Sequence, residues 1–169
     1  AGLKDYNTAL KFYKKALVID PDFAEVNNNM GNALLEHGKT EEAIDAFNKA
    51  LSIKPNFSEA HMNLGNAFKE NGRVEEAISA YDNALSIKPS FSEARMNLGE
   101  ALKKNGKLKE AIESYNNARS LKPDYAKAHL SAAAILRLHS NISEKENGFV
   151  YVDKQIRVIF EKLHSTSSD

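Results

Sequence analysis

A 34-residue period is the feature that most constrains what this 169-residue chain can fold into. Four sets of glycines, alanines and prolines recur at this interval: Gly31, Gly65 and Gly99; Gly38, Gly72 and Gly106; Ala43, Ala77 and Ala111; and Pro21, Pro55, Pro89 and Pro123. A fixed period in this range is typical of helical units that stack into an array. The period therefore predicts an all-α fold built from two-helix repeats.

The repeat over residues 58–91 shows where its two helices should begin and end. The first helix is predicted from about residue 58 to 71 and the second from about residue 74 to 87. Gly72 follows the first helix and supplies the left-handed conformation that a helix end favours. Pro89 follows the second helix, which a proline cannot continue.

Gly65 lies in the middle of the predicted first helix, where glycine costs about 1 kcal/mol relative to alanine. Because this cost recurs in every repeat, we expect close contact between the two helices to offset it. The small residues Ala77 and Ala84 on the second helix would help that approach. Larger side chains should then fill the space around the contact: Leu64, Phe68, Ile78, Tyr81 and Leu85.

The pattern resembles the tetratricopeptide repeat (TPR) family, whose signature has a small residue at positions eight and twenty, an aromatic at twenty-four, Ala at twenty-seven and Pro at thirty-two. With Ser58 as position one, three copies match: Gly31, Ala43, Phe47, Ala50 and Pro55; Gly65, Ala77, Tyr81, Ala84 and Pro89; and Gly99, Ala111, Tyr115, Ala118 and Pro123. The resemblance implies a right-handed α-α superhelix. The large aromatic usual at position four is replaced by polar residues: Asn27, His61, Arg95 and His129.

The repeat pattern divides the chain into six segments. Residues 1–23 read as the second helix of a partial repeat, and three complete repeats occupy residues 24–57, 58–91 and 92–125. Residues 126–139 read as the first helix of a degenerate fourth repeat. Residues 140–169 are predicted to hold a polar loop, a C-terminal capping helix and a disordered tail. We expect the partial first repeat to expose an apolar face, which would favour self-association or contact with upstream residues.

Charge and composition argue against several classes of function. Lys plus Arg and Asp plus Glu both number 23, so the chain lacks the basic surplus that nucleic acid or an anionic membrane would require. There is no cysteine, which excludes disulfides and thiolate chemistry. No apolar run is long enough to cross a bilayer. A cytoplasmic setting is favoured, although the sequence leaves the compartment open.

The first helices of a stacked array are expected to line one concave groove, and asparagines recur there. Position six holds Asn29, Asn63 and Asn97, and position nine holds Asn32 and Asn66. An amide side chain offers an acceptor and two donors, so it matches the C=O and N–H of a peptide unit. This column resembles the ladder of O-linked N-acetylglucosamine transferase, which contacts peptide backbone. The alternative is that these amides satisfy only neighbouring backbone or solvent.

Two further groups complete the predicted peptide-binding residues. Met62 and Met96 at position five would add an adaptable apolar strip, unless they pack against the next repeat. Lys69, Lys103 and Arg137 would favour an acidic ligand segment near the carboxyl end of the groove, unless they form an ordinary solvated face. Position five carries no lysine, which argues against a clamp for a C-terminal carboxylate.

The sequence gives little support for catalysis, and no cofactor, metal or catalytic residue is predicted. The five histidines are scattered without a metal-ligand spacing. The leading hypothesis is a non-enzymatic module that binds an extended or helical segment of a partner protein. One alternative is a substrate-recruiting arm of a larger enzyme of the glycosyltransferase or sulfotransferase type. Another is a scaffold that self-assembles through exposed end helices.

Overall fold

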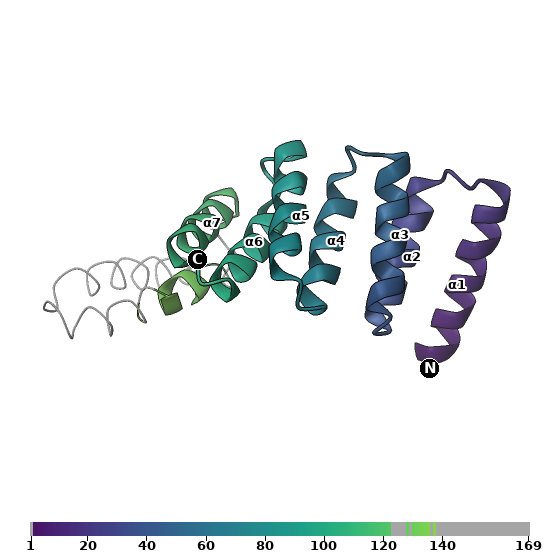
Figure 1. Cartoon of the computed structure of the whole chain (residues 1–169), viewed down its shortest axis with the longest axis horizontal. Coiled ribbons are helices and arrows are strands. Elements are labelled where there is room, and N and C mark those ends of the chain that lie inside the picture. The colour runs from purple at the N-terminus through teal and green to yellow at the C-terminus, as the bar shows by residue number, and fades with distance from the viewer. Residues whose placement is uncertain (1, 123–127, 129, 136, 138–169) are drawn as a thin grey trace, which may run out of the picture.

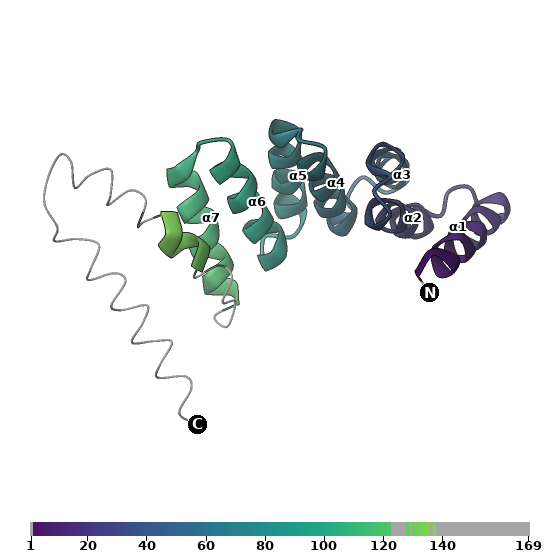
Figure 2. The same cartoon turned by 90° about the horizontal axis from the view of Figure 1, so that it is seen from below.

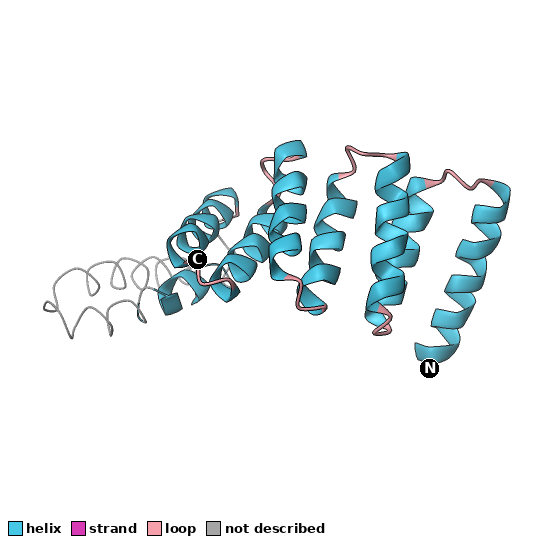
Figure 3. Ribbon diagram, in the orientation of Figure 1, coloured by secondary structure: helices cyan, strands magenta, loops and turns pink. Residues whose placement is uncertain are grey.

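The chain forms a row of helices in the computed structural model, which describes residues 2–122, 128, 130–135 and 137 (Figures 1 and 3). Seven helices lie between residues 2 and 121: α1 (Gly2–Ile19), α2 (Ala24–Glu36), α3 (Thr40–Ile53), α4 (Ser58–Glu70), α5 (Val74–Ile87), α6 (Ser92–Lys104) and α7 (Leu108–Leu121). Residues 128, 130–135 and 137 are also helical, and none of the described residues lies in a strand. The all-α prediction is confirmed. The capping helix and tail predicted within residues 140–169 lie outside the described residues.

Glycines end the first helix of each complete repeat. Gly38, Gly72 and Gly106 have φ values of +73°, +79° and +82°, a left-handed conformation that only glycine adopts at little cost. Beyond Gly72, the Arg73 amide donates to the Phe68 carbonyl at 2.9 Å, which satisfies a carbonyl that the helix end leaves open. The next helix then runs from residue 74 to 87, as predicted.

The glycine inside each first helix lies directly against an aromatic ring. A Cβ added to Gly65 would lie 2.6 Å from the Tyr81 ring, which is closer than carbon atoms pack. The same relation holds for Gly31 with Phe47 and for Gly99 with Tyr115. The predicted close contact between the two helices of a repeat is therefore confirmed, because the missing side chain makes room for the ring.

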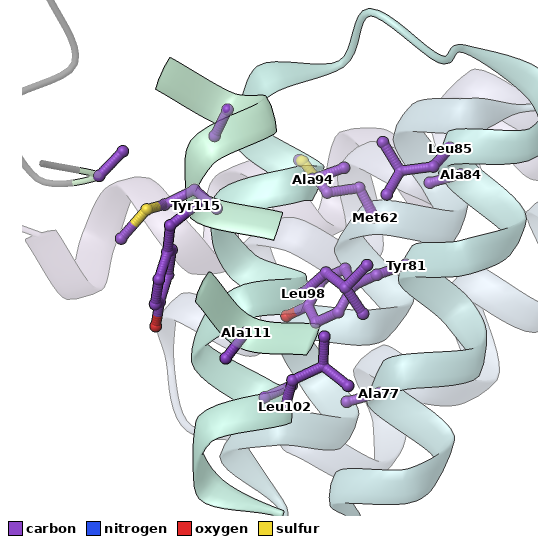
Figure 4. Close-up of a cluster of buried hydrophobic side chains, with 14 of the residues drawn as sticks. Met62, Ala77, Tyr81, Ala84, Leu85, Ala94, Leu98, Leu102, Ala111 and Tyr115 are labelled. Atoms are coloured by element: carbon purple, nitrogen blue, oxygen red, sulfur yellow. The ribbon is translucent and has the colours of Figure 1, made fainter. Parts of the chain in front are cut away.

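Buried side chains connect each repeat to the next. Figure 2 shows α2 with α3, α4 with α5, and α6 with α7 as successive pairs along the row. One cluster joins α2 to α5 around Phe47 and Leu64, and a larger one joins α4 to α7 around Tyr81 and Tyr115 (Figure 4). Each repeat thus buries its apolar surface against its neighbours, as in other solenoid proteins.

The polar residues at position four bind backbone carbonyls. His61 Nε2 lies 2.9 Å from the Pro55 carbonyl oxygen, and Arg95 Nε donates to the Pro89 carbonyl at 3.1 Å. Asn27 Nδ2 donates to the Phe23 carbonyl at 3.1 Å. These side chains hold the loop before each first helix, a role that the usual aromatic residue would not fill.

Helix α1 is the least covered of the seven. Its Tyr6 ring is buried and stacks on His37, with ring centroids 3.5 Å apart. Three of its apolar side chains are exposed, namely Phe12 at 64%, Val18 at 83% and Ile19 at 86%. The prediction that the first helix exposes apolar residues is confirmed.

Candidate functional site

The first helices of the repeats lie next to one another on one side of the row. Helix α2 contacts α4, and α4 contacts α6, whereas no comparable contact joins α3 to α5 or α5 to α7. Because the first helices approach each other more closely than the second helices do, the row bends toward their side. We call the exposed side of α2, α4 and α6 the inner face, and the side formed by α1, α3, α5 and α7 the outer face.

Asparagines on the inner face form hydrogen bonds from one repeat to the next. Asn63 Nδ2 donates to Asn28 Oδ1 at 3.0 Å, and Asn97 Nδ2 donates to Asn66 Oδ1 at 3.0 Å. We call these two contacts the amide pairs. The predicted residues Asn63, Asn66 and Asn97 are half-buried, so part of each amide still faces solvent.

A buried hydroxyl makes the second amide pair different from the first. The Tyr81 hydroxyl donates to Asn66 Oδ1 at 2.7 Å, so this oxygen accepts two hydrogen bonds. Burial, with a smaller contribution from the Glu100 carboxylate, raises the pKa of Tyr81 well above its ordinary value and keeps the hydroxyl a donor. The first repeat has Phe47 at the equivalent position, so Asn32 lacks this partner.

The charged residues predicted for the site differ in their surroundings. Lys69 Nζ lies 3.0 Å from Glu100 Oε2, and the two side chains are each 26% exposed. Lys69 is therefore already paired with a residue of the next repeat. Lys103, in the last turn of α6, and Arg137, beyond α7, are exposed.

The two methionines do not line the inner face. Met62 is 8% exposed and Met96 is fully buried, and both belong to the core cluster that joins α4 to α7. Figure 4 shows Met62 beside Ala84, Leu85 and Ala94. The prediction that they form an apolar strip for a ligand is wrong, because position five of the first helix faces the neighbouring repeat rather than solvent.

The other two asparagines predicted to bind a peptide lie on α2, where Asn29 is exposed and Asn32 is half-buried. The predicted peptide-binding residues did not include Asn28, and Tyr81 was predicted only as a packing residue, yet both hold the amide pairs in place. A signal for Asn28 was present, because position five carries an amide there and a methionine in the next two repeats. The bond from Tyr81 needs the packing of α5 on α4 and has no sequence signature.

The described helices include none with both the length and the apolar character of a membrane span. The same part of the chain contains no group of three or more His, Cys, Asp or Glu side chains placed to hold a metal ion.

Two family models match most of the chain. A model for the TPR repeat matches residues 3–38, 31–72 and 65–106. A model for the tetratricopeptide repeat matches residues 92–125. A comparison with curated protein sequences gave no match.

Several solved structures share the fold. The crystal structure of MamA aligns with a TM-score of 0.83 at 24% identity, over 98% of this chain and 93% of that one. The first TPR of Spaghetti (RPAP3), bound to the HSP90 peptide SRMEEVD, aligns with a TM-score of 0.68 at 26% identity, over 69% of this chain and 93% of that one. YrrB, a TPR protein with an unusual peptide-binding site, aligns with a TM-score of 0.70 at 26% identity, over 82% of this chain and 72% of that one.

Proposed function

Because this chain belongs to the tetratricopeptide repeat family, we propose that it is a protein–protein interaction module that binds a peptide segment of a partner along its inner face. Two structural neighbours, RPAP3 with its HSP90 peptide and YrrB with its peptide-binding site, support binding of a peptide rather than of a small molecule. The proposal includes no catalytic step. A role as the recruiting arm of a larger enzyme is compatible with the same binding face.

The observation that carries the proposal is the pairing of amides across repeats. In the second amide pair, Asn66 Oδ1 accepts from both Asn97 and Tyr81, which leaves the Asn66 amino group available as a donor. Asn97 uses its amino group for this bond, which leaves its oxygen as an acceptor. One donor and one acceptor therefore lie side by side, and a peptide unit presents the complementary set.

The first amide pair, one repeat earlier, presents an acceptor without an exposed donor beside it. Asn63 gives an amino hydrogen to Asn28 Oδ1 and keeps its own oxygen as an acceptor. Asn28 is itself buried, so the exposed part of this pair is mainly Asn63. The two amide pairs along the face would bind the main chain of an extended segment and tolerate varied side chains. This mode is similar to the asparagine ladder of O-linked N-acetylglucosamine transferase.

The charged groups favour internal peptide segments over a chain terminus. A clamp for a C-terminal carboxylate needs a lysine at position five, where this chain has Asn28, Met62 and Met96. The exposed Lys103 near the carboxyl end of the inner face would attract an acidic residue of the ligand at low ionic strength. We therefore propose main-chain recognition, with an acidic residue preferred at one end.

The test starts from peptide arrays of proteins captured by the isolated chain, followed by affinity measurements on the best peptide. Replacing Asn63 and Asn97 by Ala removes two hydrogen-bonding groups and should weaken binding by about tenfold, since each such bond contributes about 0.5–1.5 kcal/mol. The matched control replaces Asn83 and Asn117, which are exposed asparagines of the outer face, and should bind as the wild type does. Circular dichroism would establish that all variants keep their helicity.

A second measurement separates main-chain from side-chain recognition. N-methylation of successive peptide bonds in the ligand should abolish binding at the units that contact the amide pairs, whereas single alanine substitutions should cost little. Equal affinity of the N63A/N97A variant and its control would remove the inner-face asparagines from the proposal.

A further inference from the structure

The outer face carries two grooves built from the same repeat positions. One is a cavity of about 360 Å³ between α1, α2 and α3, with an apolar floor of Leu10, Met30 and Leu34. The other, of about 280 Å³, lies between α5, α6 and α7, with a floor of Ile78, Leu98 and Leu102. Every residue that lines the first has its equivalent two repeats later in the second. The same repeat positions therefore form both grooves, at places where a second helix, the next first helix and its partner meet.

The equivalent place between α3 and α5 carries different side chains. Phe68 stands there instead of the leucines at positions 34 and 102. The Arg73 guanidinium lies over the Phe68 ring at 4.5 Å, and Arg73 Nε donates to Glu76 Oε2 at 2.6 Å. The Phe68 ring and this ion pair therefore lie at the repeat position between the two grooves.

The first groove continues onto the exposed side of α1. A second cavity of about 400 Å³ shares Leu10 and Lys14 with it and adds Lys11, Lys15 and Val18. Val18 is 83% exposed, and the other second helices have serine at its position: Ser52, Ser86 and Ser120. An apolar side chain thus replaces a polar one at a place where solvent would favour the polar residue.

Lysines outnumber acidic residues around this extended groove, which is lined by five lysines and by Glu42 and Asp45. Lys11, Lys14, Lys15 and Lys49 are exposed, and none forms an ion pair with any residue whose side chain the structure describes. Lys39, on the same rim, is paired with Glu42 at 3.0 Å. We call the two joined cavities and their lysines the lysine-rimmed trough.

The second groove lacks this surplus of lysines although equivalent positions line it, because its Arg95 and Lys107 are accompanied by three acidic residues, Asp82, Glu110 and Glu113. Residues at the places of the four unpaired lysines are polar or acidic: Ser79, Asp82, Asn83 and Asn117. The positive charge is therefore not a requirement of the repeat. It distinguishes one of two otherwise matching surfaces.

We propose that the lysine-rimmed trough is a second docking surface, which binds an acidic amphipathic segment of a partner protein. Apolar side chains of the segment would pack on Leu10, Val18 and Met30, as an amphipathic helix packs in a hydrophobic groove. Its carboxylates would meet Lys14 and Lys49 on the rim, and this charge complementarity would select acidic partners. Since the trough lies on the outer face, it can bind its ligand while the inner face holds another.

The probe for this proposal is a synthetic helical peptide with leucines on one face and glutamates on both flanks of that face. Its controls are the same peptide with lysine in place of glutamate and a sequence-scrambled version. The acidic peptide should bind the wild-type chain, and its affinity should fall as salt rises, because exposed charges are screened. The lysine peptide should not bind.

Variants locate the binding on the protein. The K14E/K49E variant should weaken binding of the acidic peptide by at least tenfold, and V18S by several-fold. K109E, a charge reversal on the exposed side of α7, should have no effect. Converting the equivalent groove with D82K/N117K should add a second site for the same peptide. The inner-face variant N63A/N97A should bind the acidic peptide normally, which keeps this test independent of the proposed function.

Three results would overturn the proposal. The first is equal binding of acidic and lysine peptides, or no binding of the acidic peptide at millimolar concentration. The second is wild-type affinity in K14E/K49E with helicity intact. The third is a dimer in sedimentation that V18S dissociates, because the trough would then be covered by a second copy of the chain.

Discussion

Helices α1 and α5 carry the same repeat positions in different surroundings. In α5, Ala77, Tyr81 and Ala84 are fully buried between α4 and α6. In α1, the equivalent residues Ala9, Tyr13 and Ala16 are only half-buried. The pattern of small, aromatic and small residues therefore stabilises a helix only where the first helix of its own repeat lies on it.

The two helices also differ on the side that faces solvent. Helix α1 presents lysines and Val18, whereas α5 presents serine, aspartate and asparagine at the same positions. Positions that build the array are constrained by packing, and positions that face solvent are free to vary. The differences between equivalent repeats therefore indicate where binding specificity lies more directly than the repeated spacing does.

The largest expected effect comes from the difference in burial between the equivalent tyrosines of α5 and α1. Replacing Tyr81 by Ala should lower the free energy of unfolding by about 3–5 kcal/mol, because removing a fully buried aromatic ring leaves a cavity. Replacing Tyr13, at the same position in α1, should cost about 1 kcal/mol or less. Urea titrations followed by circular dichroism would measure both. Equal losses would mean that α1 is covered in solution.

Most of the fold follows from the sequence because its determinants are local. Gly72 and Pro89 end helices through their own backbone preferences, so the boundaries could be placed without tertiary information. The contact of Gly65 with Tyr81 could be expected because a repeated helix-weakening residue needs a repeated compensation. The helices of the array were therefore predictable.

The site was less predictable because it depends on how neighbouring repeats are aligned. Met62 was assigned to the groove by its position in the repeat, but the next repeat buries it. The amide pairs use different positions in successive repeats, since Asn63 bonds Asn28 at position five whereas Asn97 bonds Asn66 at position nine. A 34-residue period fixes the spacing of repeats but not such contacts between them.

A smaller effect is expected from filling the space that lets α5 approach α4. The Cβ of a Gly65→Ala variant would lie 2.6 Å from the Tyr81 ring, and such overpacking costs about 1–3 kcal/mol. The better helix propensity of alanine offsets part of this loss, about 1 kcal/mol. In a Tyr81→Ala background the clash is gone, so the same substitution should stabilise the chain. A destabilisation of equal size in both backgrounds would contradict the steric explanation.

A Tyr81→Phe substitution removes only the hydroxyl and should lower the free energy of unfolding by about 1 kcal/mol at neutral pH. The hydrogen bond to Asn66 is lost, while Asn97 still donates to the same oxygen.

Alkaline pH provides a second measurement. Burial raises the pKa of Tyr81 well above its usual value and that of Tyr115 to about 12. The folded chain holds these protons more tightly than the unfolded chain does. The stabilisation that these two hydroxyls provide is therefore complete below about pH 10. It is lost as the pH rises through their pKa values in the folded chain.

Variants that lack these hydroxyls test whether Tyr81 and Tyr115 cause the loss of stability at alkaline pH. A Tyr81→Phe, Tyr115→Phe double variant should lose less stability than the wild type between pH 10 and pH 12, as followed by thermal melts. A Tyr13→Phe control on α1 should follow the wild-type curve. The same decline in all three proteins would show that the buried hydroxyls do not titrate with unfolding.

The smallest expected effect exchanges the solvent-facing residues of the two helices. Val18→Ser and Ser86→Val should each change the free energy of unfolding by less than about 0.5 kcal/mol, since both side chains are exposed. Thermal denaturation of the two variants and the wild type would measure this. Losing more than about 1 kcal/mol in Val18→Ser alone would mean that Val18 is buried against another surface in solution. The lysine-rimmed trough would then already be occupied, and its exposed valine would be explained by that contact rather than by a partner still to bind.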